Sequence, residues 1–207
     1  MATQTATANR PKQDPAVAQK IQKLRDIYAD GPEMGRVALE NVLGELERAI
    51  HAQQKASTAG RTGLRQGKVS ELTMIAKFAP GGAKRLRALL NLLGNNFQGA
   101  DMVGTVHDMR FVFLDNDTKL LFTTAYDGDW DPYIDDFATK IPDAMDLLFS
   151  NMEGWPGIHN PAVRDWIANN QITADAWYVA NPNLTVAETR RLAKVGKAVD
   201  ELLDKVG

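Results

Sequence analysis

The sequence contains no cysteine, which excludes disulfide bonds, thiolate catalysis and zinc or iron–sulfur sites held by cysteine. It has no apolar run near the ~20 residues needed to cross a bilayer, so we expect no membrane partner. The first 13 residues lack the apolar core of a signal peptide and are typical of a disordered tail. Together with an ordinary globular composition, these absences favour a cytoplasmic protein.

Acidic residues are scarce in one long region of the chain, and basic residues are scarce in another. From Lys55 to Arg87, eight basic residues accompany one acidic residue, and from Asp101 to Glu153, twelve acidic residues accompany three basic ones. A chain with such segregated charge can steer an anionic ligand or pair with copies of itself. We favour a homo-oligomer, and we expect no nucleic-acid partner because the basic region lies beside so much acid.

The most informative stretch, residues 104–126, predicts two β-strands joined by a tight polar turn. Val106 to Leu114 and Lys119 to Tyr126 are rich in β-branched and aromatic residues. The Asp and Asn residues at 115–118 can bond their own backbone and tolerate left-handed geometry, as a hairpin loop requires. Strand alternation then predicts a polar side with Asp108 and Arg110, and a core-facing side with His107, Met109, Phe111 and Phe113.

The chain is expected to have four parts: a disordered tail (1–13), a helical hairpin (14–55), a linker (56–67) and an α+β domain (68–207). In the α+β domain, the pattern predicts strand, helix, two strands, helix, short helix, strand and helix. The expected ranges are 68–79, 83–93, 106–114, 119–126, 131–148 with a kink at Pro142, 160–168, 174–180 and 185–206.

This order is that of a ferredoxin-like βαββαβ fold, an antiparallel sheet with helices on one face, here extended by the N-terminal helical hairpin and a C-terminal helix. The other face of the sheet needs a cover, because Val112, Leu114 and an aromatic residue such as Trp177 or Tyr178 would otherwise contact water. Two such sheets facing each other would form a dimeric barrel with a pocket for a small-molecule ligand inside.

Asp108 and Arg110 are the first candidates for chemistry, because they share one face of a strand. Arg110 could bind a carboxylate or a haem propionate while Asp108 positions a group or accepts a proton. Alternatively, the two residues form a structural salt bridge. His107 could be a metal or haem-iron ligand or a general base, or it could be a buried, hydrogen-bonded histidine.

Other candidates lie later in the chain. His159 and Trp155 belong to the loop at 151–160, where Trp155 could form a pocket rim and His159 could act at the pocket mouth. Trp177, in the last predicted strand, could line the same pocket or belong to the core. We expect no metal site, because the acidic loop from Asp127 carries Ala138 where a calcium loop of the EF-hand type needs glutamate.

Three motifs resemble those of a bacterial group with the fold of the dimeric α+β barrel superfamily. They are Val106-His107-Asp108-Met109-Arg110-Phe111-Val112, then Leu120-Leu121-Phe122 with Tyr126-Asp127-Gly128, and Glu153-Gly154-Trp155-Pro156. The superfamily includes cofactor-free monooxygenases, dye-decolourising peroxidases and chlorite dismutase-like haem proteins, so the resemblance implies oxidative chemistry by fold-level analogy. The chain departs from the peroxidase G-x-x-D-G motif, because Thr124 precedes the Asp127-Gly128 pair where that motif has its first glycine.

The functional expectation is therefore a small-molecule oxidative enzyme, peroxidase- or monooxygenase-like, or a haem-linked protein. Its pocket would lie on the open face of the sheet, with Arg110, Asp108 and His107 as catalytic residues. His159, Trp155 and Trp177 would contact a cofactor, for which haem is the leading candidate. The alternative is a non-catalytic binding or assembly module that forms a homo-oligomer.

Overall fold

The computed structural model describes residues 14–52, 57–94 and 96–206, so the predicted tail at 1–13 lies outside the described residues. The chain divides into two units, Met1–Gln54 and Lys55–Gly207. In the first unit, α1 (Pro15–Tyr28) and α2 (Glu33–Ala52) form a helical hairpin with a small core of its own. Asp14 caps α1 by accepting a hydrogen bond from the backbone N–H of Ala16 at 2.9 Å.

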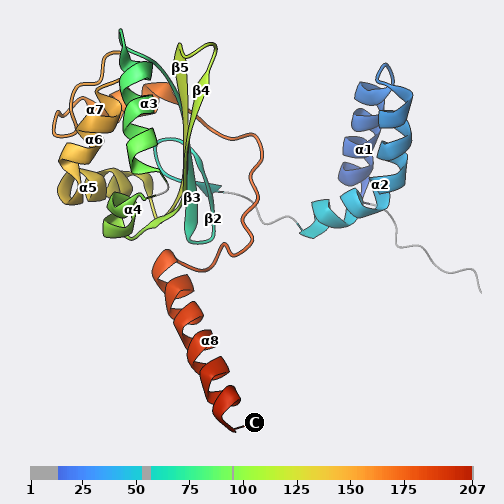
Figure 1. The fold of residues 1–207 in the computed structure, drawn as a ribbon. Coiled ribbons are helices and arrows are strands. Elements are labelled where there is room, and N and C mark those ends of the chain that lie inside the picture. Colours follow the sequence, from blue (N-terminus) through green and yellow to red (C-terminus); the bar gives the residue numbers. More distant parts are fainter. Residues whose placement is uncertain (1–13, 53–56, 95, 207) are drawn as a thin grey trace, which may run out of the picture. The chain divides into compact units, whose positions relative to one another are not determined.

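The described part of the second unit contains one antiparallel sheet of six strands (Figure 1). The strands are β1 (Ser57–Thr58), β2 (Leu64–Gln66), β3 (Val69–Lys77), β4 (Val106–Leu114), β5 (Lys119–Asp127) and β6 (Gln171–Ile172). They lie in the order β1-β2-β3-β5-β4, and β6 pairs with β3 at Thr73 and Met74. The long strands β3, β5 and β4 form most of this sheet, with β4 at one edge. The α+β class and the antiparallel layer are thereby confirmed.

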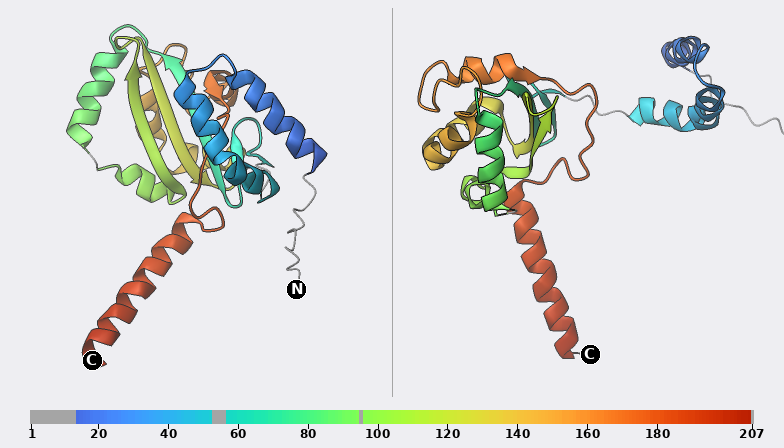
Figure 2. Two further views of the ribbon diagram at one scale, coloured as in Figure 1. Left: turned by 90° about the vertical axis from the view of Figure 1, so that its right-hand side faces the viewer. Right: turned by 45° about the horizontal axis from the view of Figure 1, so that its top comes forward.

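Helices cover one face of these long strands, as Figures 1 and 2 show. They are α3 (Gly82–Leu93), α4 (Gln98–Val103), α5 (Trp130–Lys140), α6 (Pro142–Phe149) and α7 (Val163–Asn170). The helix α8 (Val186–Val206) follows at the C-terminal end. None of the helices in the described part of the chain is long and apolar enough to cross a membrane.

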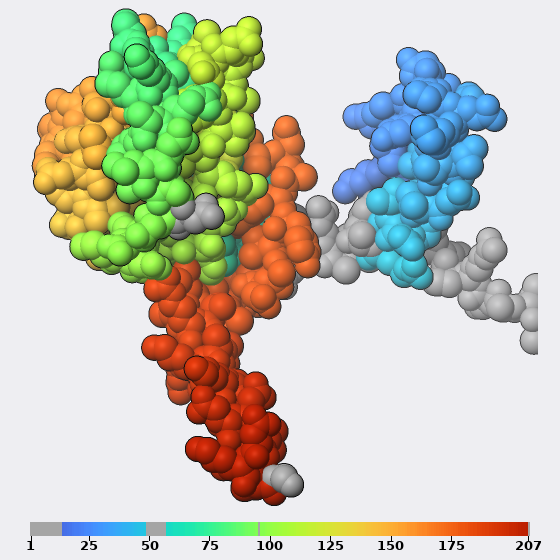
Figure 3. All heavy atoms as spheres, in the orientation of Figure 1, coloured from blue at the N-terminus to red at the C-terminus, as the bar shows by residue number. Residues whose placement is uncertain are grey.

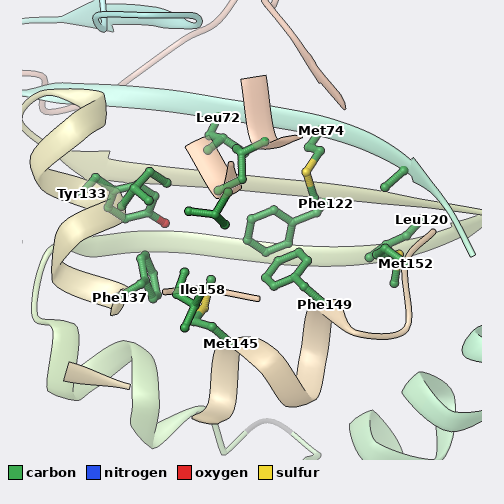
Figure 4. Packing of buried hydrophobic residues seen from close by; sticks show 14 of the residues in the cluster. Leu72, Met74, Leu120, Phe122, Tyr133, Phe137, Met145, Phe149, Met152 and Ile158 are labelled. Carbon is green, nitrogen blue, oxygen red and sulfur yellow. The ribbon is translucent and has the colours of Figure 1, made fainter. Parts of the chain in front are cut away.

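The main core lies between the helix-covered face and the helices, and Figure 4 shows its packing. Alternate residues of the strands supply one side, including Leu72, Met74 and Phe122, while α5 and α6 supply Phe137 and Phe149 from the other. The period-2 alternation of β3 and β5 produces this arrangement, because every second side chain points to the same face.

The predicted hairpin is confirmed. β4 and β5 pair from Leu114 opposite Lys119 toward the far end of the sheet. Asp115, Asn116 and Asp117 have φ angles of 50°, 51° and 64°, the left-handed conformation that Asp and Asn tolerate best after glycine. The turn closes when the Thr118 backbone N–H donates to the Leu114 carbonyl oxygen at 3.2 Å.

Three predicted elements are wrong. The expected strand at 174–180 is irregular, and the last strand is the two-residue β6 just before it. Residues 57–66 of the expected linker contain β1 and β2, and Ala59 between them is fully buried. The expected helix at 131–148 is two helices, since Pro142 lacks an N–H to continue α5 and instead begins α6.

Candidate functional site

A cavity of about 290 Å³ lies between the helix-covered face of the sheet and α3–α6. The sheet contributes Leu72 and Met74 of β3, Met109 and Phe111 of β4, and Phe122 of β5. The helical side includes Leu89 and Leu93 of α3, the start of α4, and residues of α5 and α6 such as Ile134, Phe137, Ala144 and Phe149. The cavity is thus a gap in the main core, bounded by the same apolar faces that fold the domain.

The C-terminal end of α3 and the short helix α4 form one side of the cavity. α3 ends at Leu93 and is capped by Gly94, whose φ of 56° suits a residue without a side chain. The chain then turns into α4, where a Cβ on Gly99 would come within 3.3 Å of the Ile141 side chain. Gly99 therefore lets α4 approach the junction of α5 and α6 closely. Asn96 and Gln98, which are exposed, line the cavity at this turn.

Aromatic rings form a continuous wall. Phe97 and Phe111 stack with ring centres 6.0 Å apart, and Phe111 contacts Phe122 at 5.0 Å. Phe122 meets Phe149 edge to face at 5.3 Å, and Phe149 contacts Trp155 at 5.3 Å. Ring pairs at these separations attract each other beyond their apolar burial, so the wall is a preformed surface suited to a flat ligand.

Two hydrogen-bonded groups border the cavity. The hydroxyl groups of Tyr133 and Thr124 are 3.0 Å apart, and burial raises the pKa of Tyr133 above its usual value. The indole N–H of Trp155 donates to the Asp146 carboxylate at 2.8 Å, and the same oxygen accepts the backbone N–H of Ile158 at 2.8 Å. Asp146 therefore fixes the loop that carries Trp155 against the cavity, while Tyr133 keeps its proton at neutral pH.

Asp108 and Arg110 lie on the other face of the sheet. They form an ion pair of 2.7 Å whose side chains are 44% and 67% exposed. Because Met109 and Phe111 point into the cavity, strand alternation directs the side chains of Asp108 and Arg110 away from it. The structure thus brings these two residues together, but it does not place them at the cavity.

His107 departs from the predicted alternation. The pairing of β4 with β5 shifts between Val106 and Asp108, so His107 is the extra residue of a β-bulge. His107 is exposed rather than part of the core, and its Nε2 lies 2.7 Å from Asp127 Oδ1. The second oxygen of Asp127 accepts the backbone N–H of Val186 at 3.0 Å. This corrects the core-facing prediction and ties His107 to the start of α8.

Of the six predicted site residues, Trp155 lines the cavity. His159 is exposed in the loop after it, and Trp177 lies in the irregular segment after β6, where its carbonyl oxygen accepts a hydrogen bond from Gln66 at 2.7 Å. Sequence reasoning missed the roles of Phe97, Tyr133 and Phe149. The apolar period of α5 and α6 indicated that one face of these helices is buried, but it does not distinguish a packed core from a cavity wall. Phe97 lies just before α4, a helix that the sequence pattern did not predict.

Haem, the cofactor that the resemblance implies, does not suit this cavity. The propionates of haem need cationic partners, and none of the described residues that line the cavity is basic or histidine. Tyr133 is a possible iron ligand only as a tyrosinate, which its burial disfavours. Nor do the described residues include a group of three or more His, Asp or Glu side chains that could hold a metal ion.

Comparison with known proteins gives no relative: no family model, curated protein or solved structure matches the chain.

Proposed function

We propose that this protein is a binding module that holds a small, neutral aromatic molecule in the cavity between the sheet and α3–α6. The observation that carries this proposal is a cavity of about 290 Å³ with an aromatic wall inside the main core. Ligand sites are typically concave, largely apolar and preformed, with a few polar groups that orient the ligand.

The apolar lining supports an occupant. The cavity opens to solvent at the turn that carries the exposed Asn96 and Gln98, so without a ligand its apolar lining contacts water. A ligand that displaces this water would gain about 25 cal/mol per Å² of apolar surface that it buries. By binding the folded chain, it would also stabilise the fold by mass action.

The volume and chemistry limit the ligand. At a packing density of about 0.7, the cavity holds about 200 Å³ of ligand, on the order of 12 non-hydrogen atoms. That size corresponds to two fused aromatic rings. A ligand hydroxyl could bond the Tyr133 oxygen, which already lies within hydrogen-bond distance of Thr124.

A binding role is preferred to the oxidative role implied by the resemblance. The described lining contains no carboxylate or imidazole that could serve as a general base. Oxidative chemistry on the open face, with Arg110, Asp108 and His107 as its residues, stays a prediction, as do haem binding and a cytoplasmic location.

We further propose that the sheet is ferredoxin-like, because the pairing order β6-β3-β5-β4 fits a split βαβ arrangement.

The experiment combines native mass spectrometry of the purified full chain with titration of 2-naphthol, followed by thermal shift. We expect either a small co-purifying molecule or saturable stabilisation by 2-naphthol. Ala144→Phe, which places a ring in the cavity, should abolish both effects. Ala162→Phe, at an exposed position before α7, is the matched control and should behave as the parent chain.

Two results would contradict the proposal. One is a parent chain that carries no small molecule and gains no stability from 2-naphthol or from naphthalene. The other is an Ala144→Phe variant that folds and binds the probe as the parent chain does.

A further inference from the structure

Among the described residues, the contacts that join α8 to the rest of its unit lie at the beginning of the helix. Thr185 and Glu188 form a capping box, in which the Thr185 backbone N–H donates to Glu188 at 2.7 Å and the Glu188 backbone N–H donates to the Thr185 hydroxyl at 3.2 Å. Lys68 bonds the same Glu188 carboxylate at 2.6 Å, and Arg190 pairs with Asp101 at 2.5 Å. Beyond Arg190, no described residue of α8 is buried. Figure 3 shows α8, in red, extending away from the sheet and its covering helices.

The exposed part of α8 carries an apolar stripe with heptad spacing. Its residues follow one another at intervals of three, four, three and four, and each is between 47% and 73% exposed: Leu192, Val195, Val199, Leu202 and Val206. Alternating intervals of three and four are the pattern of the a and d positions in a coiled coil. A helix with this spacing buries its stripe against another helix, and the described part of the unit places none there.

Gly196 is a second unusual feature of the same helix. Glycine in a helix interior is destabilising relative to alanine, and nothing lies within 4 Å of where its Cβ would be. Contacts within the described chain therefore do not account for it. In the heptad frame Gly196 flanks the stripe between Val195 and Val199, where the lack of a side chain would let a second helix approach closely.

Charge along α8 selects the orientation of the partner helix. The half from Arg190 to Lys197 contains four basic residues and no acidic one, whereas the half from Asp200 to Lys205 contains three acidic residues and one basic one. An antiparallel pair would set each basic half beside the acidic half of the other helix, and it would also oppose the helix dipoles. A parallel pair would set like charges together.

We propose that α8 pairs with α8 of a second copy of this chain as a short antiparallel coiled coil. To bring the two apolar stripes together, the antiparallel helices must cross beside residue 197 of each copy. Leu192 then packs opposite Leu202 of the second copy, and Val195 packs opposite its Val199. A pair of helices this long would bury on the order of 1,000 Å², near the lower limit for a specific interface. The dimer should therefore be reversible, with a dissociation constant on the order of micromolar.

Sedimentation velocity of the full chain over a micromolar concentration series tests the pairing. The parent chain should shift from monomer to dimer, and the double variant Val199→Asp/Leu202→Asp should remain monomeric at every concentration. Ala193→Asp, which adds the same charge outside the stripe, is the control and should dimerise as the parent does. A parent chain that stays monomeric, or a double variant that dimerises with unchanged affinity, would overturn the proposal.

Single cysteines test the orientation, because the natural chain has none. Under mild oxidation, a mixture of Leu192→Cys and Leu202→Cys chains should form the mixed disulfide, and each variant alone should cross-link at least tenfold less. Efficient cross-linking of each variant with itself, without the mixed species, would show a parallel pair and refute the antiparallel arrangement. Neither experiment depends on the cavity, so this inference stands or fails separately from the proposed ligand.

Discussion

Filling the cavity by substitution should stabilise the protein, in contrast to most changes in a core. Ala144 of α6 lines the cavity, so a larger side chain at this position can extend into the cavity. Ala144→Leu adds three carbons, and each buried methylene group contributes about 0.8 kcal/mol, for a gain of about 2.4 kcal/mol. Fixing the leucine rotamer costs about 0.5–1 kcal/mol, which leaves a net stabilisation of about 1.5 kcal/mol.

Urea denaturation followed by circular dichroism measures this change. For a unit of this size, the midpoint of thermal unfolding should rise by about 3–6 °C, provided that any co-purified ligand has first been removed. The affinity for 2-naphthol should fall in the same variant, because the leucine side chain occupies part of the ligand's space. A higher free energy of unfolding together with a lower affinity for 2-naphthol would identify the cavity as a ligand-binding site.

The opposite sign would refute the reasoning. In a fully packed core, three added carbons force side chains out of their preferred rotamers and typically cost about 1–3 kcal/mol. If Ala144→Leu lowers the free energy of unfolding by that amount, the space beside Ala144 is not available in solution and the proposed ligand site fails with it. The exposed control Ala162→Leu should change stability by less than about 0.5 kcal/mol.

Two further predictions concern charged residues. Arg110→Ala should change the free energy of unfolding by less than about 1 kcal/mol, because the ion pair of Arg110 with Asp108 is exposed. The variant should also bind 2-naphthol as the parent chain does. Loss of binding would indicate a ligand site on the open face of the sheet. The hydrogen bonds of Lys68, followed by those of Thr185, lower the pKa of Glu188 from 4.5 to about 2, so its contribution to stability should be present above pH 4.5 and lost as the pH falls toward 2. The difference in urea midpoint between the parent and Glu188→Gln should disappear over that range, and a difference that persists at pH 2 would contradict this assignment.

Features that depend on neighbouring residues could be predicted from the sequence. The turn at 115–118 follows from the local chemistry of Asp and Asn, and the capping box at Thr185 and Glu188 follows from two side chains three residues apart. Asp14 before Pro15 similarly marks the start of α1. In each case the energy that favours the structure comes from groups within a few residues, so no knowledge of the tertiary fold is needed.

Features that depend on distant residues could not be predicted. The bulge at His107 rotates one side chain out of the alternation, and it is visible only when β4 is paired with β5. The strands β1, β2 and β6 are two or three residues long, too short for a period to be detected. β2 and β6 pair with β3, and β1 pairs with β2. Their cause therefore lies in the hydrogen-bonding groups of the neighbouring strands rather than in their own sequence.

The two proposed interaction sites show why an apolar period alone does not reveal function. Phe137, Ile141 and Met145 recur at four-residue intervals along α5 and α6, and Val195, Val199 and Leu202 recur in a similar way along α8. The first set lines a cavity inside the domain, whereas the second is about half exposed. Regular apolar spacing indicates only that one face of a helix is buried against something. Whether the chain itself, a ligand or a second copy covers that face depends on which surfaces the folded domain leaves exposed. For the stripe on α8, the basic half and the acidic half of the helix favour a second copy.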